Sequence, residues 1–196
     1  MKTLAQIKQP MIGLFNLPVV LVTCTDDKGS ANIIPLGWVG GVCSSPPQIA
    51  LGIRPSRYSY NLIKKSGEFV VNIPCVDLVK EVDKCGFCSG RNTDKFERFH
   101  LTPLPASKVS SPLIKECPVN LECRLRHFLS LGSHGLFIGE IVAVQADKEL
   151  VREDGEINYS CLKPLYLRHD EYCGPSEPVG YYGFTKFRER VVNKVF

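Results

Sequence analysis

The chain lacks any apolar run long enough to cross a membrane as a helix, which takes about 20 consecutive residues. The apolar segment nearest the N-terminus, MIGLFNLPVVLV, is interrupted by Asn16 and Pro18. Lys2 precedes this segment, but no clear cleavage site of an export signal follows it. These absences predict a cytoplasmic protein with no membrane segment.

A strong charge of either sign is also missing. The 24 Lys and Arg residues stand against 20 Asp and Glu residues, which gives a formal net charge of +4. This charge is too small and too dispersed to indicate nucleic-acid binding, although it favours the approach of small anions. No repeat and no low-complexity segment occurs, and 196 residues suffice for a full hydrophobic core. We therefore predict a single domain over residues 1–196.

Several motifs that mark common active sites are absent. The sequence has no G-x-G-x-x-G after a strand and no P-loop, which argues against a Rossmann or nucleoside triphosphate site. It also has neither a His-x-x-x-His metal motif nor a G-x-S-x-G nucleophile elbow. Of the four histidines, His100, His127 and His169 have no partner at a fixed spacing and are expected at the surface. His134 lies in the turn-like segment LGSHGLF, where glycines allow the close approach of another molecule. On the residues alone, a turn histidine that faces water is the favoured interpretation.

The nine cysteines cannot all pair in disulfides, because their number is odd. Cys24 and Cys123 lie in strand-like runs and are expected to be small core residues. Cys85 and Cys88 form one C-x-x-C, but it lacks the strand-then-helix setting of a thioredoxin site and no second C-x-x-C follows. We expect no metal site here and favour a structural or incidental role. The weaker alternative, a thiol or zinc module, would be decided by a metal assay.

Strand-like runs outnumber helical ones. PVVLVTC and SANIIPLGWVG are joined by a polar turn at Gly29, and QIALGI, EFVVNI, VNLECRLRHFLSL and GLFIGEIVAVQAD follow. The last two runs predict a long hairpin across GSHG. Short amphipathic helices are predicted over VDLVKEVDKC and around residues 94–99. The pattern favours a mainly β protein, an antiparallel barrel with a few peripheral helices.

The segment IRPSRYSYNLIKKSGEFVVNIP carries an unusual group of Arg, Ser and Tyr residues between a strand and a helix. Ser56 is a candidate N-cap and Gly67 a candidate C-terminal cap of that helix. A helix N-terminus surrounded by hydroxyl and guanidinium groups suits a phosphate. On this segment alone, an ordinary capped helix with solvated arginines is an equally good interpretation.

Taken in order, PVVLVTCTDDKGSANIIPLGWVGG, the RPSRYS segment, CGFCSGRNTDKF, PLIKECPVNLECRL and LGSHGLFIGEIVAV resemble the flavin reductase-like, FMN-binding split-barrel family. The resemblance runs from about residue 18 to residue 167, is greatest to the flavoredoxin-type branch, and extends to GYYGF in the 168–196 tail. It implies an antiparallel split barrel, a homodimer, tightly bound FMN near the subunit interface, and NADH or NADPH as electron donor.

The resemblance also implies functions for individual residues. One segment would hold the FMN phosphate and the nearby ribityl chain, the next strand would face the isoalloxazine, and a loop would close over the cofactor. His134, in the histidine turn of the family, would lie towards the nicotinamide and is the candidate catalytic residue. The cofactor-binding residues would be Arg54, Ser56, Arg57, Tyr58 and Ser59 for the phosphate, Trp38 and Val39 for the ring, and Ser89, Gly90 and Lys95 in the loop.

Two departures from the family pattern bear on function. Ser133 replaces the Asp that often precedes the histidine, and a hydroxyl orients an imidazole less strongly than a carboxylate. Cys88 replaces a small apolar residue. Two functions are therefore expected: an NAD(P)H-dependent flavin reductase that passes electrons to flavin, ferric or protein acceptors, or an FMN electron carrier reduced by a partner protein. In the carrier, the aromatic tail with Tyr181, Tyr182 and Phe184 would be a lid over the flavin.

Overall fold

The computed structural model describes residues 16–180 and 182, and Tyr181 and Phe184 of the expected lid lie outside these residues. The main sheet has seven strands in the order β3-β2-β6-β9-β10-β5-β4, and all its pairings are antiparallel. Its strands are β2 (Val20–Thr25), β3 (Ala31–Leu36), β4 (Val39–Ser44), β5 (Pro47–Ile53), β6 (Glu68–Ile73), β9 (Val119–Leu131) and β10 (His134–Ala146).

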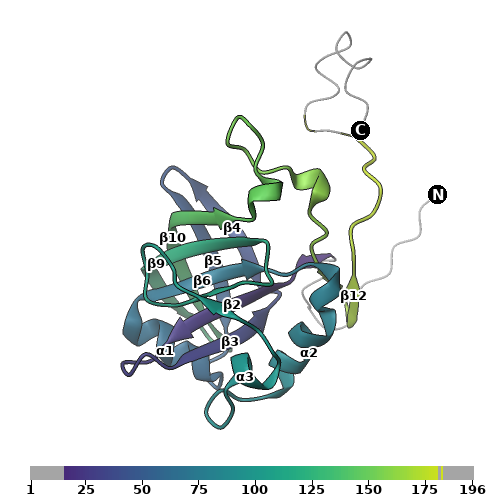
Figure 1. The fold of residues 1–196 in the computed structure, drawn as a ribbon. Helices are drawn as coiled ribbons and strands as arrows, with labels where there is room; N and C mark the ends of the chain where they lie inside the picture. Colours follow the sequence, from purple (N-terminus) through teal and green to yellow (C-terminus); the bar gives the residue numbers. More distant parts are fainter. Residues whose placement is uncertain (1–15, 181, 183–196) are drawn as a thin grey trace, which may run out of the picture.

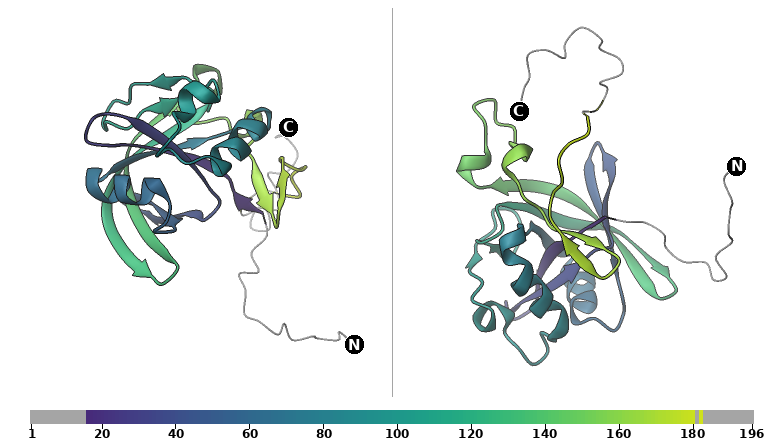
Figure 2. Two further views of the ribbon diagram at one scale, coloured as in Figure 1. Left: turned by 90° about the horizontal axis from the view of Figure 1, so that it is seen from below. Right: turned by 90° about the vertical axis from the view of Figure 1, so that its right-hand side faces the viewer.

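Barrel closure follows from the strand order. β3 and β4 are the two edges of the sheet, yet they are consecutive in the chain and only Gly37 and Trp38 separate them. Two edges that are joined by two residues must lie close together, so the sheet curls on itself. Trp38 continues the pairing beyond β4, because its carbonyl accepts a hydrogen bond of 2.8 Å from the Gly52 N–H. The expected antiparallel barrel is confirmed, and the tip of the β9–β10 hairpin extends beyond the rest of the sheet (Figure 2).

Three helices lie against this sheet: α1 (Tyr58–Ser66), α2 (Val79–Phe87) and α3 (Lys95–Arg98). The 3-10 turn η1 (Val76–Leu78) directly precedes α2, whereas η2 (Lys148–Leu150) and η3 (Tyr159–Cys161) lie between β10 and the next strand of the chain. The remaining strands are short: β7 (Pro103–Leu104) pairs with β8 (Leu113–Ile114), and β11 (Tyr166–Arg168) lies between β1 (Leu17–Pro18) and β12 (Glu171–Cys173). This small second sheet lies on the side of α2, away from α1 (Figure 1).

Both faces of β2 are buried, which explains its continuous apolar run. Val20, Val22 and Cys24 belong to one core cluster, which β5, β6, β10 and α1 complete. Val19 and Leu21 belong to a second cluster, between the sheet and helices α2 and α3. The alternation of strand side chains between the two faces therefore supplies both cores. The core roles predicted for Cys24 and Cys123 are confirmed, since neither side chain is exposed.

The predicted caps of α1 are correct at one end only. Gly67 adopts the left-handed conformation, with φ 71°, and its N–H donates to the Ile63 carbonyl at 2.9 Å. At the other end the N-cap is Arg57, in extended conformation and without a side-chain cap, so the prediction of Ser56 was wrong by one residue. Arg57 takes this position because its N–H closes a turn onto the Arg54 carbonyl, at 3.0 Å, before the helix begins.

The remaining elements follow the prediction with one correction. The β9–β10 hairpin turns at Gly132, with φ 70°, so His134 is the first residue of β10 and not part of the turn. His100, His127 and His169 are exposed, as predicted. Among the described residues no helix combines the length and apolar character needed to span a membrane.

Candidate functional site

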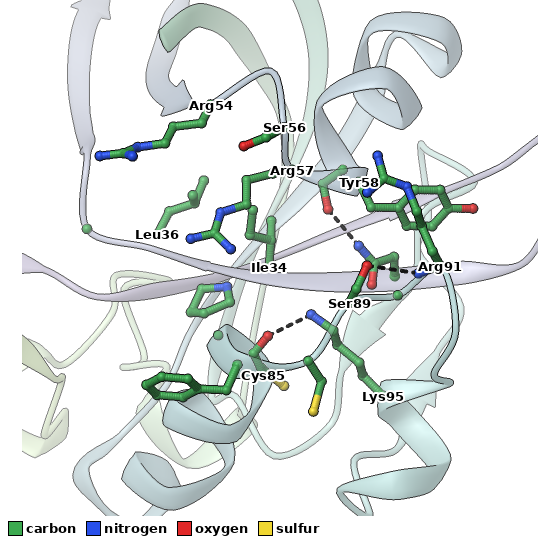
Figure 3. Close-up of a pocket in the computed structure, with 18 of the residues that line it drawn as sticks. Ile34, Leu36, Arg54, Ser56, Arg57, Tyr58, Cys85, Ser89, Arg91 and Lys95 are labelled. Carbon is green, nitrogen blue, oxygen red and sulfur yellow. Dashed lines mark hydrogen bonds between the residues drawn. The ribbon is translucent and has the colours of Figure 1, made fainter. Parts of the chain in front are cut away.

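A cavity of about 420 Å³ lies beside Gly37 and Trp38, the two residues that connect β3 to β4. The end of β3, the start of α1, the end of α2 and the loop that follows α2 all contribute to its wall. Figure 3 shows Arg54, Ser56 and Arg57 on one side and Cys85 and Lys95 on the other. The structure thus brings together residues that are far apart in the sequence. Of the predicted site, it places in this wall Trp38, Arg54, Ser56, Arg57, Tyr58, Ser59, Ser89, Gly90, Lys95 and His134.

The N-terminus of α1 is part of the wall. The first backbone N–H groups of a helix have no carbonyl partner within the helix, and the helix dipole adds partial positive charge there. In α1 these groups belong to Tyr58 and Ser59, whereas the Tyr60 N–H already reaches the Arg57 carbonyl at 3.1 Å. No acidic residue occurs in the first turn of α1. This end of the cavity is therefore suited to an anion.

The charged side chains of the wall all have one sign. Arg54, Arg57, Arg91 and Lys95 line the cavity, and its lining, taken over the described residues, includes no Asp or Glu. The Arg91 guanidinium lies 5.5 Å from the centre of the Tyr58 ring, a cation–π contact that ties the loop after α2 to the start of α1. Because no carboxylate neutralises these cations, a phosphate group is the ligand that fits their charge best.

The Lys95 side chain connects three elements of the cavity wall through hydrogen bonds. This side chain is 4% exposed, and its Nζ donates hydrogen bonds of 2.6 Å to the carbonyls of Ile33 and Cys85. It therefore links α3 to β3 and to α2. Burial lowers the pKa of this amine below its ordinary value, and the nearby thiols oppose that shift. An ammonium has three donors, so one remains for a ligand.

Asn32 is a site residue that the sequence did not indicate. Its side chain is buried, its Nδ2 donates to the Ser59 hydroxyl at 2.7 Å, and its Oδ1 has no partner within the described part of the chain. A Cβ at Gly90 would overlap that Oδ1, so the loop after α2 approaches Asn32 as closely as it does only because residue 90 is glycine. Asn32 looks like any other polar residue of a strand, and only the folded contacts reveal its position.

Trp38 and His134 form the other end of the cavity. Their rings stack with centroids 4.1 Å apart and planes inclined by 23°. The Ser133 hydroxyl lies 2.9 Å from His134 Nδ1, so the residue that replaces the family Asp does contact the imidazole. Burial, and next the positive charge of Arg54, lower the pKa of His134, which favours the neutral ring.

A second cavity, of about 480 Å³, adjoins the first, and the Trp38–His134 pair lies between them. Its wall is mainly apolar and includes Val39, Leu131 and Leu136. Val39 therefore lines this second space, and it is the one predicted site residue outside the wall of the first. Among the described residues no cluster of three or more His, Cys, Asp and Glu side chains could hold a metal ion.

A curled antiparallel sheet with a cation-lined cavity beside the connection of its two edges fits the class of flavin reductase-like split barrels. Residues 12–176 match the model of the flavin reductase like domain, and the chain belongs to this family. It is 41% identical to an uncharacterized protein of Archaeoglobus fulgidus over 146 residues, 74% of this chain and 81% of the relative. It is 30% identical to an uncharacterized protein of Pyrococcus abyssi, over 82% of this chain and 85% of the relative.

Solved structures agree with this assignment. The flavoredoxin of Desulfovibrio vulgaris (Miyazaki F) matches with a TM-score of 0.86 and 31% identity, over 94% of this chain and 100% of that protein. The flavoredoxin of Methanosarcina acetivorans matches with a TM-score of 0.81 and 30% identity, over 93% of this chain and 100% of that protein. The predicted family is therefore confirmed, and the matches to two flavoredoxins agree with the predicted resemblance to the flavoredoxin-type branch.

Two features of the cavity fit a flavin mononucleotide. The cations and free N–H groups at the start of α1 suit its phosphate. The buried Asn32 Oδ1, which lacks a donor and belongs to a side chain bonded to Ser59 at the start of α1, suits a donor close to the phosphate, such as a hydroxyl of the ribityl chain. The space against Asn32 is kept open by the absence of a side chain at Gly90.

The close packing of Gly90 against Asn32 can be tested by substitution. We predict that Gly90→Ala destabilises the protein by about 1–3 kcal/mol, because the new methyl group must displace a buried side chain or the loop. Urea unfolding measures this change. Gly41→Ala is the matched control, since a Cβ there meets no atom within 4 Å. Equal stability of the Gly90 variant and the wild type would contradict the packing described here.

Proposed function

We propose that the protein binds FMN in the first cavity and acts as an NAD(P)H-dependent flavin reductase that passes electrons to flavin, ferric or protein acceptors. The observation that carries this proposal is the cavity wall beside the start of α1, where the described residues supply four cationic side chains and no carboxylate. The family and its flavin-binding neighbours support the same cofactor.

In this proposal each part of the wall has a separate task. Arg54 and Arg57 neutralise the phosphate, and the free N–H groups of Tyr58 and Ser59 bind its oxygens. The Ser59 hydroxyl accepts a hydrogen bond from the Asn32 amide and keeps its own O–H to donate. Bound FMN supplies the redox chemistry, taking electrons from the nicotinamide and releasing them to the acceptor, while the protein binds and orients it.

His134 has a limited part in this reaction. Transfer of electrons between nicotinamide and flavin needs no general base, and the lowered pKa of His134 keeps its ring neutral near neutral pH. A neutral imidazole that stacks on Trp38 and contacts Ser133 can donate or accept one hydrogen bond. We propose that it orients the donor at the boundary between the two cavities.

A second candidate function is an FMN electron carrier that a partner protein reduces. The Trp38–His134 stack favours it, because this pair lies between the two cavities and would have to move to admit a nicotinamide ring between them. The similarity to two flavoredoxins agrees with either function.

Anaerobic reduction separates the two functions. We predict that NADH or NADPH bleaches the flavin absorbance of the FMN-loaded protein within seconds, as a typical enzyme turnover of about 1–1,000 per second requires. Dithionite is the control, because it reduces the flavin of a carrier as well. Bleaching by dithionite alone would reject the reductase and leave the carrier.

The phosphate site is tested by comparing two flavins. We predict that Arg54→Ala weakens FMN binding about ten- to hundredfold, since a charge-assisted hydrogen bond contributes about 1.5–3 kcal/mol. Riboflavin has no phosphate, so it should bind to the Arg54→Ala variant nearly as well as it binds to the wild type. Fluorescence titration measures both affinities, and Arg152→Ala, an exposed arginine outside the cavity wall, is the matched control. Equal losses for both flavins would show that Arg54 supports the fold and not the phosphate.

We also propose that the protein is a homodimer. β4 pairs with β5 on one side only, and all of its residues from Gly40 to Ser44 are exposed. Val42 in this strand and Leu129 and Leu131 at the hairpin tip are 54%, 47% and 57% exposed, and an apolar edge strand of this kind needs cover. Sedimentation at micromolar concentration should give twice the chain mass. A monomer over the whole concentration range would contradict the proposal.

A further inference from the structure

Two cysteines line the cavity that we assign to FMN. Cys85 lies in the last turn of α2 and Cys88 is the residue that caps this helix, so the C-x-x-C motif forms part of the cavity wall. Cys85 is 1% exposed, whereas Cys88 is half-buried. From the sequence alone the pair had no setting for redox chemistry. The fold places Cys85 on the opposite side of the cavity from Arg54 and Arg57 (Figure 3).

The backbone at the end of α2 allows these two sulfurs to meet. Residues three apart on a helix lie on the same face, with Cβ atoms about 5–6 Å apart. A disulfide needs Cβ atoms about 3.5–4.5 Å apart, so the bond requires a small approach of one residue. Cys88 has already left the helix, with φ −106° and ψ 143°, and can make this approach without breaking a helical turn. Both cysteines are free thiols in the structure.

Lys95 places a positive charge beside the pair. Its Nζ donates to the Cys85 carbonyl at 2.6 Å, and negative charge on either thiol would raise the pKa of this amine. Burial nevertheless raises the pKa of Cys85 to about 11, so Cys85 stays protonated at neutral pH. The more accessible Cys88 is therefore the sulfur that reacts first with an outside reagent, and Cys85 is the one that resolves the bond.

We propose that Cys85 and Cys88 form a reversible disulfide that is reduced by the flavin bound in the same cavity. In the reduction, the S–S bond breaks and each sulfur gains one electron and one proton. The reduced flavin supplies both electrons and one proton, solvent supplies the other proton, and the flavin returns to its oxidised form. This inference depends on the proposed function for its electron source, while formation of the disulfide itself does not.

The proposed pair gives each chain a second store of electrons beside the flavin. A disulfide takes two electrons on reduction, as many as a flavin does. A loaded chain would thus hold four, and the dithiol could pass its pair to an acceptor while the flavin is reduced again.

Reductive titration of the loaded protein measures this capacity directly. Protein that has been oxidised with glutathione disulfide and desalted is titrated anaerobically with dithionite while flavin absorbance is recorded. We predict two electrons more per flavin for the wild type than for Cys88→Ser. Cys161→Ser, which removes an exposed cysteine outside the cavity wall, should behave as the wild type does. Cys85→Ala breaks the pair at its other sulfur and should show the same deficit per bound flavin.

The variants also separate this role from a structural one. The electron count is taken per bound flavin, so a change in the flavin content of Cys88→Ser does not alter it. The deficit of this variant should appear in that count. A loss of FMN together with an unchanged electron count per bound flavin would overturn the proposal and make the sulfur a packing group.

Peptide mapping tests the bond without any flavin. Trypsin cleaves after Lys84 and Arg91, so Cys85 and Cys88 share one peptide that holds no other cysteine. In oxidised apoprotein this peptide should be lighter by two hydrogens and resist iodoacetamide until a dithiol reductant is added. Alkylation of both cysteines in the oxidised sample would refute the disulfide. If the bond forms but no flavin binds, the failure lies in the proposed function and not in the pair.

Discussion

The closure of the barrel depends on a constraint of chain length. The two edges of the seven-stranded sheet are consecutive strands, and Gly37 and Trp38 alone connect them. Because this connection is so short, the two edges must lie close together. Trp38 thereby comes to lie against His134 at the start of β10. The stacked Trp38–His134 pair is a consequence of this closure, since its two residues are far apart in the sequence. The same closure places this pair in one cavity wall with the cationic start of α1.

The positive potential of the cavity comes from the side chains that surround the connection between β3 and β4. Cations from three segments meet a helix N-terminus, and the described wall contains no carboxylate that would neutralise them. Buried polar groups fix the geometry: Lys95 joins α3 to β3 and α2, and Asn32 joins β3 to α1 through Ser59. The Oδ1 of Asn32 remains without a donor in the described structure. A ligand with a phosphate and a hydrogen-bond donor close to it, such as a hydroxyl of a ribityl chain, satisfies both demands.

Much of this arrangement could be predicted from the sequence, where the signal is local. The alternating strands, the cap at Gly67 and the Arg-Pro-Ser-Arg-Tyr-Ser segment all act over a few residues, and the structure places all of that segment except its proline in the cavity wall. The predictions that failed, or could not be made, concerned either an element boundary, which was wrong by one residue, or a long-range contact. Ser56 was displaced as the N-cap by the turn that the Arg57 N–H makes. Asn32 and the location of the C-x-x-C motif could not be predicted, because they depend on how β3 and α2 pack.

Flavin content is the most direct test of the central claim, which is that this cavity holds FMN. The absorbance of the freshly purified protein, compared with its protein concentration, gives the amount of bound flavin, and chromatography of the released cofactor identifies it. The account predicts flavin bands that correspond to about one FMN per chain, as expected for a pre-formed site. Protein that is folded, colourless and unable to take up added FMN would contradict it.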